Sequence, residues 1–453
     1  MPIETGKPGE GIQPILRKLL LNQQAIVDAI SGGAGGNAVN LTAVGGTSVA
    51  SPLPVAVDPS VAVPIAFSDS ASIDAFDRLR VSNPTGLFES TLTYDAQPLL
   101  WNQKITGAGS VTHLPDESAV RMRLTGASAT IERTTRSYFR YQPGKSQLIF
   151  MTFAFGQGSQ DIIKRVGYFD TNNGIYLQEV GGELSLFIRS SVTGSPVNTG
   201  VSQGNWNINT FPDFDPTKAS ILVIDLEWLG VGRVRVGFVQ DGRIAYAHEF
   251  LHANTIDTVY MSTAQLPLCL FTTSGPGFVG TNDLIGICGS VISEGGQDEN
   301  IGFPFSIRST ALRTIGTPLP VLSIRPKATY NGRINRVEIV QRALEVFNQA
   351  NALIAYDVIY NGTLTGAVWT SVDSSSVVEY DLTATAISGG IKVLGGFVGS
   401  TNQAKGGQAT NITGRLPLSL DIDGANPTPL SIVCTNLSGI GDCAAQFNWQ
   451  EYR

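Results

Sequence analysis

Hydrophobic and polar residues alternate in short runs through most of this chain. Clear examples are SQLIFMTFAFG (146–156), ELSLFIRSSV (183–192) and SILVIDLEWLGVGRVRVGFV (220–239). A period of two sends successive side chains to opposite faces of a strand, and turn residues separate the runs at short intervals. The pattern therefore predicts an all-β protein, with a lectin-like or jelly-roll β-sandwich over residues 86–325.

A second, C-terminal β-domain is expected over residues 326–453. The stretch RINRVEIVQRALEVF (333–347) contains good helix formers, but Val and Ile alternate with polar residues in RVEIVQ, which favours strands. The end of the chain, PLSIVCTNLSGIGDCAAQFNWQEYR (429–453), predicts a hairpin whose last strand buries Phe447 and Trp449.

The spacing of apolar residues changes near the N-terminus. There, residues 1–36 predict a short helix followed by the Gly-rich hinge SGGAGG. The seam positions of a heptad repeat are Ile12, Leu16, Leu19, Gln23, Ile26 and Ile30. So short a helix is marginal alone, so we expect it either to pack on its own domain or to form a coiled coil, with three strands favoured over two.

An extended arm is predicted over residues 37–85. The segment is rich in Val, Ala, Ser and Pro, is nearly uncharged and has no helical period. Its prolines forbid a central strand and favour extended or edge conformations. Because it is too apolar for a free linker, we expect it to lie against another surface, such as an identical chain.

Composition narrows the class of function. Gly contributes 50 of the 453 residues, only 15% of residues are charged and the formal net charge is −7. Lys and Arg gather into no stripe or patch, so we expect no nucleic-acid partner. The sequence shows neither a Sec-type signal nor an apolar run of membrane-spanning length, and it carries no cofactor motif, so we expect no membrane insertion and no cofactor.

The pattern His-Glu-x-x-His occurs once, as His248, Glu249 and His252. On a helix it would bind zinc and supply a general base. Here it ends the run RIAYAHEF, which with GRVRVGFV and the dipeptide Asp241-Gly242 between them predicts a β-hairpin. Along a strand the two imidazoles would lie about 13 Å apart, so we expect no metal site.

Two carboxylates in IDLEW, Asp225 and Glu227, fall on the same face of a predicted strand. Glycosidases of the lectin-like sandwich class place the general acid and the nucleophile in this way. A separation of about 5 to 5.5 Å between the two carboxyls is typical of enzymes that retain the configuration of the sugar at the cleaved bond. Alternation creates such pairs often, so a solvated strand face is the favoured interpretation and we expect no catalytic residues.

Other polar and aromatic residues have ordinary explanations. Asp213 and Asp215, like Asp421 and Asp423, have the carboxylates of a calcium loop but fit turns better. Sugar-stacking platforms are conceivable for four tryptophans, although core positions are favoured; these are Trp101, Trp206, Trp228 and Trp369.

Four cysteines are too few for a disulfide framework, and most are expected to be buried as small apolar side chains. Cys434 and Cys443 flank the Gly-rich turn CTNLSGIGDC and could face each other across a hairpin. Whether they form a disulfide depends on the compartment, which the sequence does not reveal.

Several stretches resemble a family of virion structural proteins of tailed bacteriophages. They are DAFDRLRVSNPTGLFES (74–90), FRYQPGKSQLIFMTFAFG (139–156), KRVGYFDTNNGIYL (164–177), IDLEWLGVGRVRVGFV (224–239), VISEGG (291–296) and NGTLTGAVWTSVDSSSVVEYDLTATAISGG (361–390). The resemblance runs from about residue 74 to the end of the chain. It implies a tail-associated or otherwise unassigned structural protein of the virion, made in the host cytoplasm and released by lysis, with no enzymatic residues.

Together these observations predict a non-enzymatic virion protein: a homotrimeric tail fibre, tail-tip or baseplate component attached to other virion proteins through residues 1–73. A capsid decoration or head-fibre protein is the alternative of the same class. A carbohydrate-binding or polysaccharide-degrading sandwich, with a host surface glycan as ligand, is the alternative of another class.

Overall fold

The computed structural model describes residues 43–44, 47–48, 73–75, 78–80, 83–296, 298, 301–400, 406–412 and 416–453. Contacts divide the chain into two units, Met1–Ala66 and Phe67–Arg453. Within the first unit the described residues form one antiparallel pair, β1 (Ala43–Val44) with β2 (Thr47–Ser48). The heptad positions from Ile12 to Ile30, and most of the predicted arm, lie outside the described residues.

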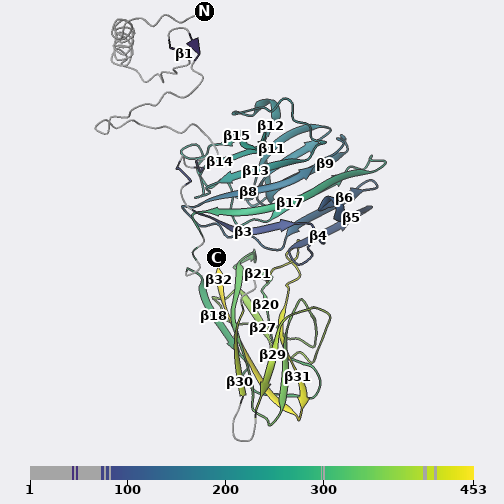
Figure 1. Ribbon diagram of the computed structural model, residues 1–453, viewed down its shortest axis with the longest axis vertical. Helices are drawn as coiled ribbons and strands as arrows, with labels where there is room; N and C mark the ends of the chain where they lie inside the picture. The colour runs from purple at the N-terminus through teal and green to yellow at the C-terminus, as the bar shows by residue number, and fades with distance from the viewer. Residues whose placement is uncertain are drawn as a thin grey trace, which may run out of the picture. The chain divides into compact units, whose positions relative to one another are not determined.

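The second unit begins with a sandwich of two antiparallel sheets. The seven-stranded sheet has the order β12 (Val197–Ser202), β11 (Glu183–Ser190), β10 (Gly174–Val180), β9 (Ile162–Phe169), β16 (Leu268–Ser274), β7 (Thr130–Thr135) and β4 (Trp101–Thr106). The eight-stranded sheet has the order β15 (Arg243–Phe250), β14 (Val234–Gln240), β13 (Ser220–Leu226), β8 (Ser146–Ala154), β17 (Asn282–Glu294), β6 (Ala119–Leu124) and β5 (Gly109–Leu114), with β3 (Pro84–Thr91) also pairing with β17. Figure 1 shows β13, β8 and β17 side by side.

A single apolar core fills the space between these two sheets. Alternation along β13 illustrates how it forms, because Leu222, Ile224 and Leu226 are buried in it while Val223 and Asp225 face the other way. Each large apolar side chain removed from water contributes roughly 1.5–3 kcal/mol.

A second sandwich follows in the same unit. Its five-stranded sheet has the order β18 (Phe303–Arg308), β32 (Gly441–Tyr452), β23 (Glu338–Asn348) and β30 (Gly406–Asn411), with β19 (Arg313–Ile315) also pairing with β32. Its six-stranded sheet has the order β26 (Thr370–Ser371), β27 (Val378–Asp381), β20 (Leu319–Pro326), β31 (Leu430–Ser438), β24 (Leu353–Tyr360) and β29 (Ile391–Gly399). These strands begin at Phe303, upstream of residue 326, where we expected the second domain to start.

Short elements complete the described part of the chain. They are the strand pairs β21 (Thr329–Tyr330) with β22 (Arg333–Ile334) and β25 (Thr363–Thr365) with β28 (Ala386–Ser388), and the 3-10 turns η1 (Pro115–Glu117) and η2 (Gln203–Asn205).

The all-β prediction is confirmed, as are two local details. The stretch that mixes helix and strand formers is the strand β23. The Asp241-Gly242 turn joins β14 to β15, and both residues have positive φ, 51° and 73°, as the commonest two-residue hairpin turn requires.

The predicted hairpin at the C-terminus is wrong in its pairing. Phe447 and Trp449 are buried as expected, at 0% and 1% exposure. However, β31 pairs with β20 and β24, whereas β32 pairs with β18, β19 and β23. The turn after Ser438 therefore carries the chain from the six-stranded sheet to the five-stranded sheet.

Alternation in β15 is also interrupted. The register shifts opposite Val236 and Gly237, so that Gly237 pairs with Tyr246 and Val236 with His248, leaving Ala247 as the extra residue of a β-bulge. Phe250 consequently points into the sandwich core, whereas Tyr246 faces outward. Tyr246 and Phe250 therefore lie on opposite faces of β15, although strict alternation would place them on the same face.

Candidate functional site

The candidate carboxylates Asp225 and Glu227 lie at the end of β13, and both are 0% exposed. The Asp225 carboxylate accepts four hydrogen bonds. Its Oδ2 accepts from Arg80 Nη2 and Arg235 Nη2, each at 2.5 Å, and from the Tyr246 hydroxyl at 2.9 Å. Its Oδ1 accepts from Ser146 Oγ at 2.8 Å.

Glu227 binds the same segment of chain that contacts Asp225. Its Oε2 lies 2.6 Å from Arg78 Nη2, and Arg78 Nε lies 2.6 Å from Asp74 Oδ2. Arg80 Nη1 lies 2.8 Å from Glu294 Oε1 at the end of β17. We call this set the arginine latch: Arg78, Arg80, Arg235 and the carboxylates Asp74, Asp225, Glu227 and Glu294 that they contact.

The latch fastens residues 73–75 and 78–80 to the outer face of the eight-stranded sheet. Arg235, itself 0% exposed, also donates from Nη2 to the Ile73 carbonyl at 2.8 Å. Burial raises the pKa of the Glu227 carboxyl, and the guanidinium of Arg78 opposes that rise. Buried charges persist in this way only when they are paired and hydrogen-bonded.

The predicted solvated strand face is therefore wrong. Glycoside hydrolysis needs two carboxyls flanking a sugar that can reach them, and these two are covered by arginines from a segment about 150 residues earlier in the chain. The pair holds the latch together instead. Alternation could place the two carboxylates on one face, but it could not show what covers that face.

The side chains of the His-Glu-x-x-His pattern have separate partners. His248 Nδ1 in β15 accepts from the Asn207 backbone N–H at 3.1 Å. His252 lies beyond the strand, with Nδ1 2.9 Å from the Gly232 carbonyl oxygen and its ring stacked on Tyr260 at 4.0 Å. Glu249 Oε2 lies 3.2 Å from Arg233 Nη1. Among the described residues no group of three His, Cys, Asp or Glu is placed to hold a metal ion.

The acidic loops behave as turns. Asp215 accepts from the backbone N–H and the hydroxyl of Thr217, and Asp421 accepts from the backbone N–H of Ala425. Asp423 pairs with Lys104 at 2.5 Å, and Asp213 is exposed.

The tryptophans divide between core and partly covered positions. Trp101 and Trp206 belong to the first core, each 5% exposed, which confirms the core interpretation for both. Trp228 is half-buried edge-on to Tyr141, and Trp369 is half-buried under the guanidinium of Arg325 at 4.0 Å.

A row of amide side chains lies on the outer face of β32. Gln446, Asn448 and Gln450 alternate there with the buried Phe447 and Trp449. A groove of about 530 Å³ passes over this face and is lined by Pro304, Phe305, Ser306, Arg342, Asn448, Trp449 and Gln450. The buried half of this strand was predicted from its sequence and the polar half was not, although the alternation in CAAQFNWQEY shows both.

Arg342 reaches the groove because it is the extra residue of a β-bulge, where the register shifts between Gln341 and Ala343. Its Nε donates to Gln450 Oε1 at 2.7 Å and its Nη2 to the Tyr452 hydroxyl at 2.8 Å. That hydroxyl donates to Gln450 Oε1 at 3.0 Å. We call Gln446, Asn448, Gln450, Arg342 and Tyr452 the amide face.

The amide face is held in one arrangement before any ligand arrives. Gln446 Nε2 donates to Asn448 Oδ1 at 3.0 Å, and Arg342, Gln450 and Tyr452 form a second hydrogen-bonded set beside this pair. Amide and guanidinium groups offer donors and acceptors in fixed planar geometry. Such a surface can recognise a ligand rich in hydroxyl groups.

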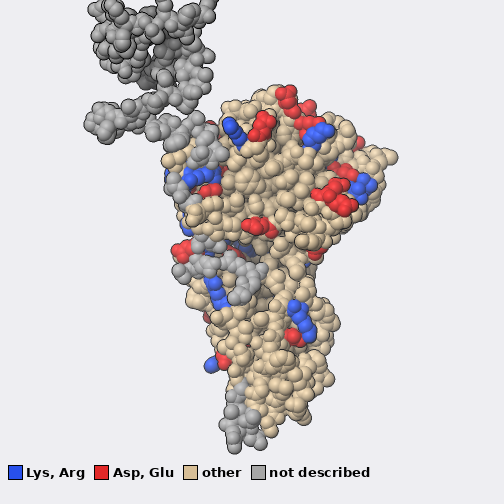
Figure 2. All heavy atoms as spheres, in the orientation of Figure 1, with Lys and Arg blue, Asp and Glu red and all other residues tan. Residues whose placement is uncertain are grey.

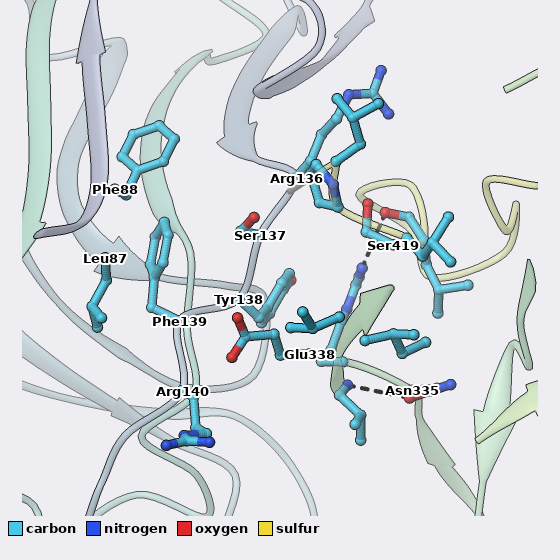
Figure 3. Close-up of a pocket in the computed structure, with 18 of the residues that line it drawn as sticks. Leu87, Phe88, Arg136, Ser137, Tyr138, Phe139, Arg140, Asn335, Glu338 and Ser419 are labelled. Carbon is cyan, nitrogen blue, oxygen red and sulfur yellow. Dashed lines mark hydrogen bonds between the residues drawn. The ribbon is translucent and has the colours of Figure 1, made fainter. Parts of the chain in front are cut away.

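An enclosed cavity of about 150 Å³ lies elsewhere in the second unit (Figure 3), where Phe88 and Phe139 face Asn335 and Ser419 across it. Arg140, one of the arginines that line this cavity, already has partners. Arg140 donates to the Asp298 carbonyl at 2.6 Å and lies over the Tyr452 ring at 4.3 Å. Because such contacts link residues of the first sandwich with residues of the second, we assign this cavity to their joint.

Among the described residues, no helix is long and apolar enough to span a membrane.

No family model and no curated protein matches the sequence. Solved structures do match over about half of the chain. A glycoside hydrolase family 16 protein from Bacteroides ovatus is 8% identical, with 45% of this chain and 99% of that chain covered and a TM-score of 0.33. The β-glucanase of Bacillus licheniformis is 13% identical, with 47% and 99% covered and a TM-score of 0.30. The CBM2 module of the evolved Dit of Lactobacillus casei BL23 phage J-1 is 5% identical, with 48% and 99% covered and a TM-score of 0.32.

These comparisons correct one expectation. We expected a chain without enzymatic activity, and that expectation is contradicted because the matches are named as endo-glucanases and other glycoside hydrolases. At 8–13% identity the likeness to these four concerns the sandwich fold and identifies no catalytic residue in this chain.

Proposed function

We propose that this protein binds an uncharged polysaccharide through the amide face of its second sandwich. The observation that carries the proposal is the groove of about 530 Å³ over a strand whose outward side chains are amides. Its volume falls within the range of roughly 300–1,000 Å³ that is usual for ligand sites.

The chemistry of the amide face suits a linear chain of hydroxyl-bearing units. Side chains two residues apart on a strand are about 6.6 Å apart, so Gln446, Asn448 and Gln450 present donors and acceptors at a regular spacing. Arg342 is the charged group in the groove, and its guanidinium is engaged by Gln450 and Tyr452. Figure 2 shows only a few small groups of charged side chains on the drawn face of the second sandwich.

The names of two matched structures also mention glucan or a glucanase, although the proposal rests on the groove and not on that likeness. The test is co-sedimentation of the full-length protein with insoluble glucans and bacterial cell walls, with release of reducing sugar measured in the same samples. Combined replacement of Asn448 and Gln450 by Ala is expected to weaken binding at least 10-fold. Gln178→Ala, an amide on the first sandwich, is the matched control and should bind as the wild type does.

Equal binding by the double variant and the control would remove the amide face from the proposal, and failure to bind any glycan would refute it. Sugar release that survives the double variant would indicate a hydrolytic site elsewhere in the chain.

A second candidate function is favoured by the arginine latch. We propose that the protein is a virion structural component attached through its N-terminal region: a trimeric tail fibre, tail-tip or baseplate protein, or alternatively a capsid decoration or head fibre. The latch supports attachment because it fastens the start of the second unit to the sandwich with paired charges, of which Asp225 and Arg235 are fully buried. A pulling force on the N-terminal segment would therefore be transmitted to the β-sheet through these ion pairs.

The solution mass of the full-length chain, compared with that of a chain starting at Phe67, tests this second function. A trimer that becomes a monomer on truncation is expected. A monomeric full-length chain would contradict self-association through the N-terminus.

A further inference from the structure

The thiols of Cys434 and Cys443 meet in the interior of the second sandwich. Cys434 lies in β31 of the six-stranded sheet and Cys443 in β32 of the five-stranded sheet. Both are 0% exposed, both belong to the core between those sheets, and both are free thiols. The two thiols are close enough for each to shift the pKa of the other. They therefore face each other between opposite sheets, and not across a hairpin as the spacing suggested.

The backbone holds both cysteines in place. Cys434 pairs with Leu319 on one side and Tyr356 on the other. Cys443 likewise pairs with Arg313 and Asn348. Because each strand is hydrogen-bonded on both edges at these positions, neither cysteine can move away from the other without breaking a ladder.

The turn between the two strands is also well defined. Gly439 has φ +71°, a conformation that suits glycine, and the Asn436 side-chain oxygen accepts from the Gly441 backbone N–H at 3.0 Å. Leu437 and Ile440 at its tip are 52% and 66% exposed. Local opening at this tip would give a small reagent a path to the sulfurs without unfolding either sheet.

The two sulfurs differ in reactivity. The neighbouring Cys443 thiol and burial raise the pKa of the Cys434 thiol, whereas the neighbouring Cys434 thiol lowers the pKa of the Cys443 thiol. The thiolate is the reactive form, so Cys443 is the sulfur that attacks first.

We propose that Cys434 and Cys443 are a modification site at which a low-molecular-weight disulfide forms a bond between the two sheets. The Cys443 thiolate attacks one sulfur of the reagent and displaces its first thiolate. Cys434 then loses its proton and attacks the Cys443 sulfur of the mixed disulfide, displacing the second thiolate. The protein loses two protons and two electrons, and the reagent is reduced to two thiols.

The bond would serve a chain that leaves a reducing compartment. Thiols stay reduced in the cytosol and oxidise outside it. A link between β31 and β32 would resist separation of the two sheets, whose outer face carries the groove of the proposed glycan site. The inference does not depend on that proposed function.

The experiment compares the full-length wild-type protein after incubation with oxidised glutathione and after incubation with dithiothreitol. Each sample is denatured in N-ethylmaleimide and digested with trypsin, and the peptides are weighed. The sequence has no Lys or Arg between Leu416 and Tyr452, so both cysteines fall in one peptide. Oxidation is expected to leave that peptide two hydrogens lighter than the unmodified peptide and without maleimide, while the buried Cys269 stays alkylated.

Full alkylation of Cys434 and Cys443 after oxidation, or a disulfide that joins either of them to Cys269 or Cys288, would overturn the proposal. Cys288→Ser is the matched control and should oxidise as the wild type does. Cys443→Ala should lose the change and retain Cys434 as an alkylated thiol, with circular dichroism to confirm that the variant is folded. Because the main measurement uses the wild type, a variant that fails to fold leaves it intact.

Discussion

Replacing Asp225 by Asn removes the negative charge that holds two guanidinium groups in the arginine latch. The carboxylate is fully buried and lies 2.5 Å from both Arg80 Nη2 and Arg235 Nη2. Arg80 retains Glu294 as a second partner at 2.8 Å, whereas the Arg235 side chain is 0% exposed and loses its carboxylate. The variant therefore removes the buried carboxylate that lies 2.5 Å from the Arg235 guanidinium.

The size of the effect follows from the cost of breaking a buried ion pair, about 3–5 kcal/mol when one partner is removed. Asn keeps one of the two oxygens, so it can still accept from either Ser146 or Tyr246 but not from both, which places the expected loss near the lower end, at about 3 kcal/mol. For a domain of this size each kcal/mol lowers Tm by roughly 2–4 °C, so the first sandwich should melt roughly 6–12 °C earlier.

Differential scanning calorimetry of the full-length protein provides the measurement, with urea unfolding followed by tryptophan fluorescence as a second probe. The matched control is Asp213→Asn, which makes the same chemical change on an exposed loop and should stay within about 0.5 kcal/mol of the wild type. An equally small effect of Asp225→Asn would refute the assignment of the latch as a buried charge network.

Three further predictions concern other buried groups. Burial lowers the pKa of His248 and of His252, so protonation favours the unfolded chain. The free energy of unfolding should therefore have its full value above the ordinary histidine pKa of about 6.5 and should fall as the pH drops below it. Urea midpoints at neutral and mildly acidic pH measure this effect. If stability depended on pH just as strongly after both histidines were replaced by Gln, the prediction would be wrong. Lys164→Met should lower the free energy of unfolding by about 3–5 kcal/mol, because it leaves the Glu179 carboxylate, 3.7 Å away and 0% exposed, without its lysine. Adding Glu179→Leu should recover most of that loss, as measured by urea unfolding. If the double variant recovered nothing, the two groups would not act as a charge pair. Metal analysis of the purified chain should find no stoichiometric zinc, and zinc that disappears with His252→Gln would falsify the strand interpretation of the His-Glu-x-x-His motif.

Much of the fold could be predicted because alternation is a local property of the chain. RVEIVQ indicated a strand despite the helix formers that follow, and β23 is a strand. Asp241-Gly242 indicated a hairpin turn, since few residues other than glycine accept positive φ. The sheet change between β31 and β32 was not predicted, because the sequence of a turn does not reveal which partners each strand will find.

The candidate sites were harder to predict because each depends on side chains that are distant in sequence. The spacing of Asp225 and Glu227 placed them together, yet their environment comes from Arg78 and Arg80, which precede them by 149 and 145 residues. The same limit applied to the groove, where a bulge in β23 brings Arg342 beside Gln450.

By itself, the sequence determined the β class, the positions of many strands and which face of each strand is apolar, since these follow from the identity of near neighbours. Only the tertiary structure decided that two carboxylates are sealed under arginines, that two thiols meet between opposite sheets and that a row of amides borders a groove. Burial and pairing depend on which segments pack together, and that choice is made by the free energy of the whole fold and not by any local pattern.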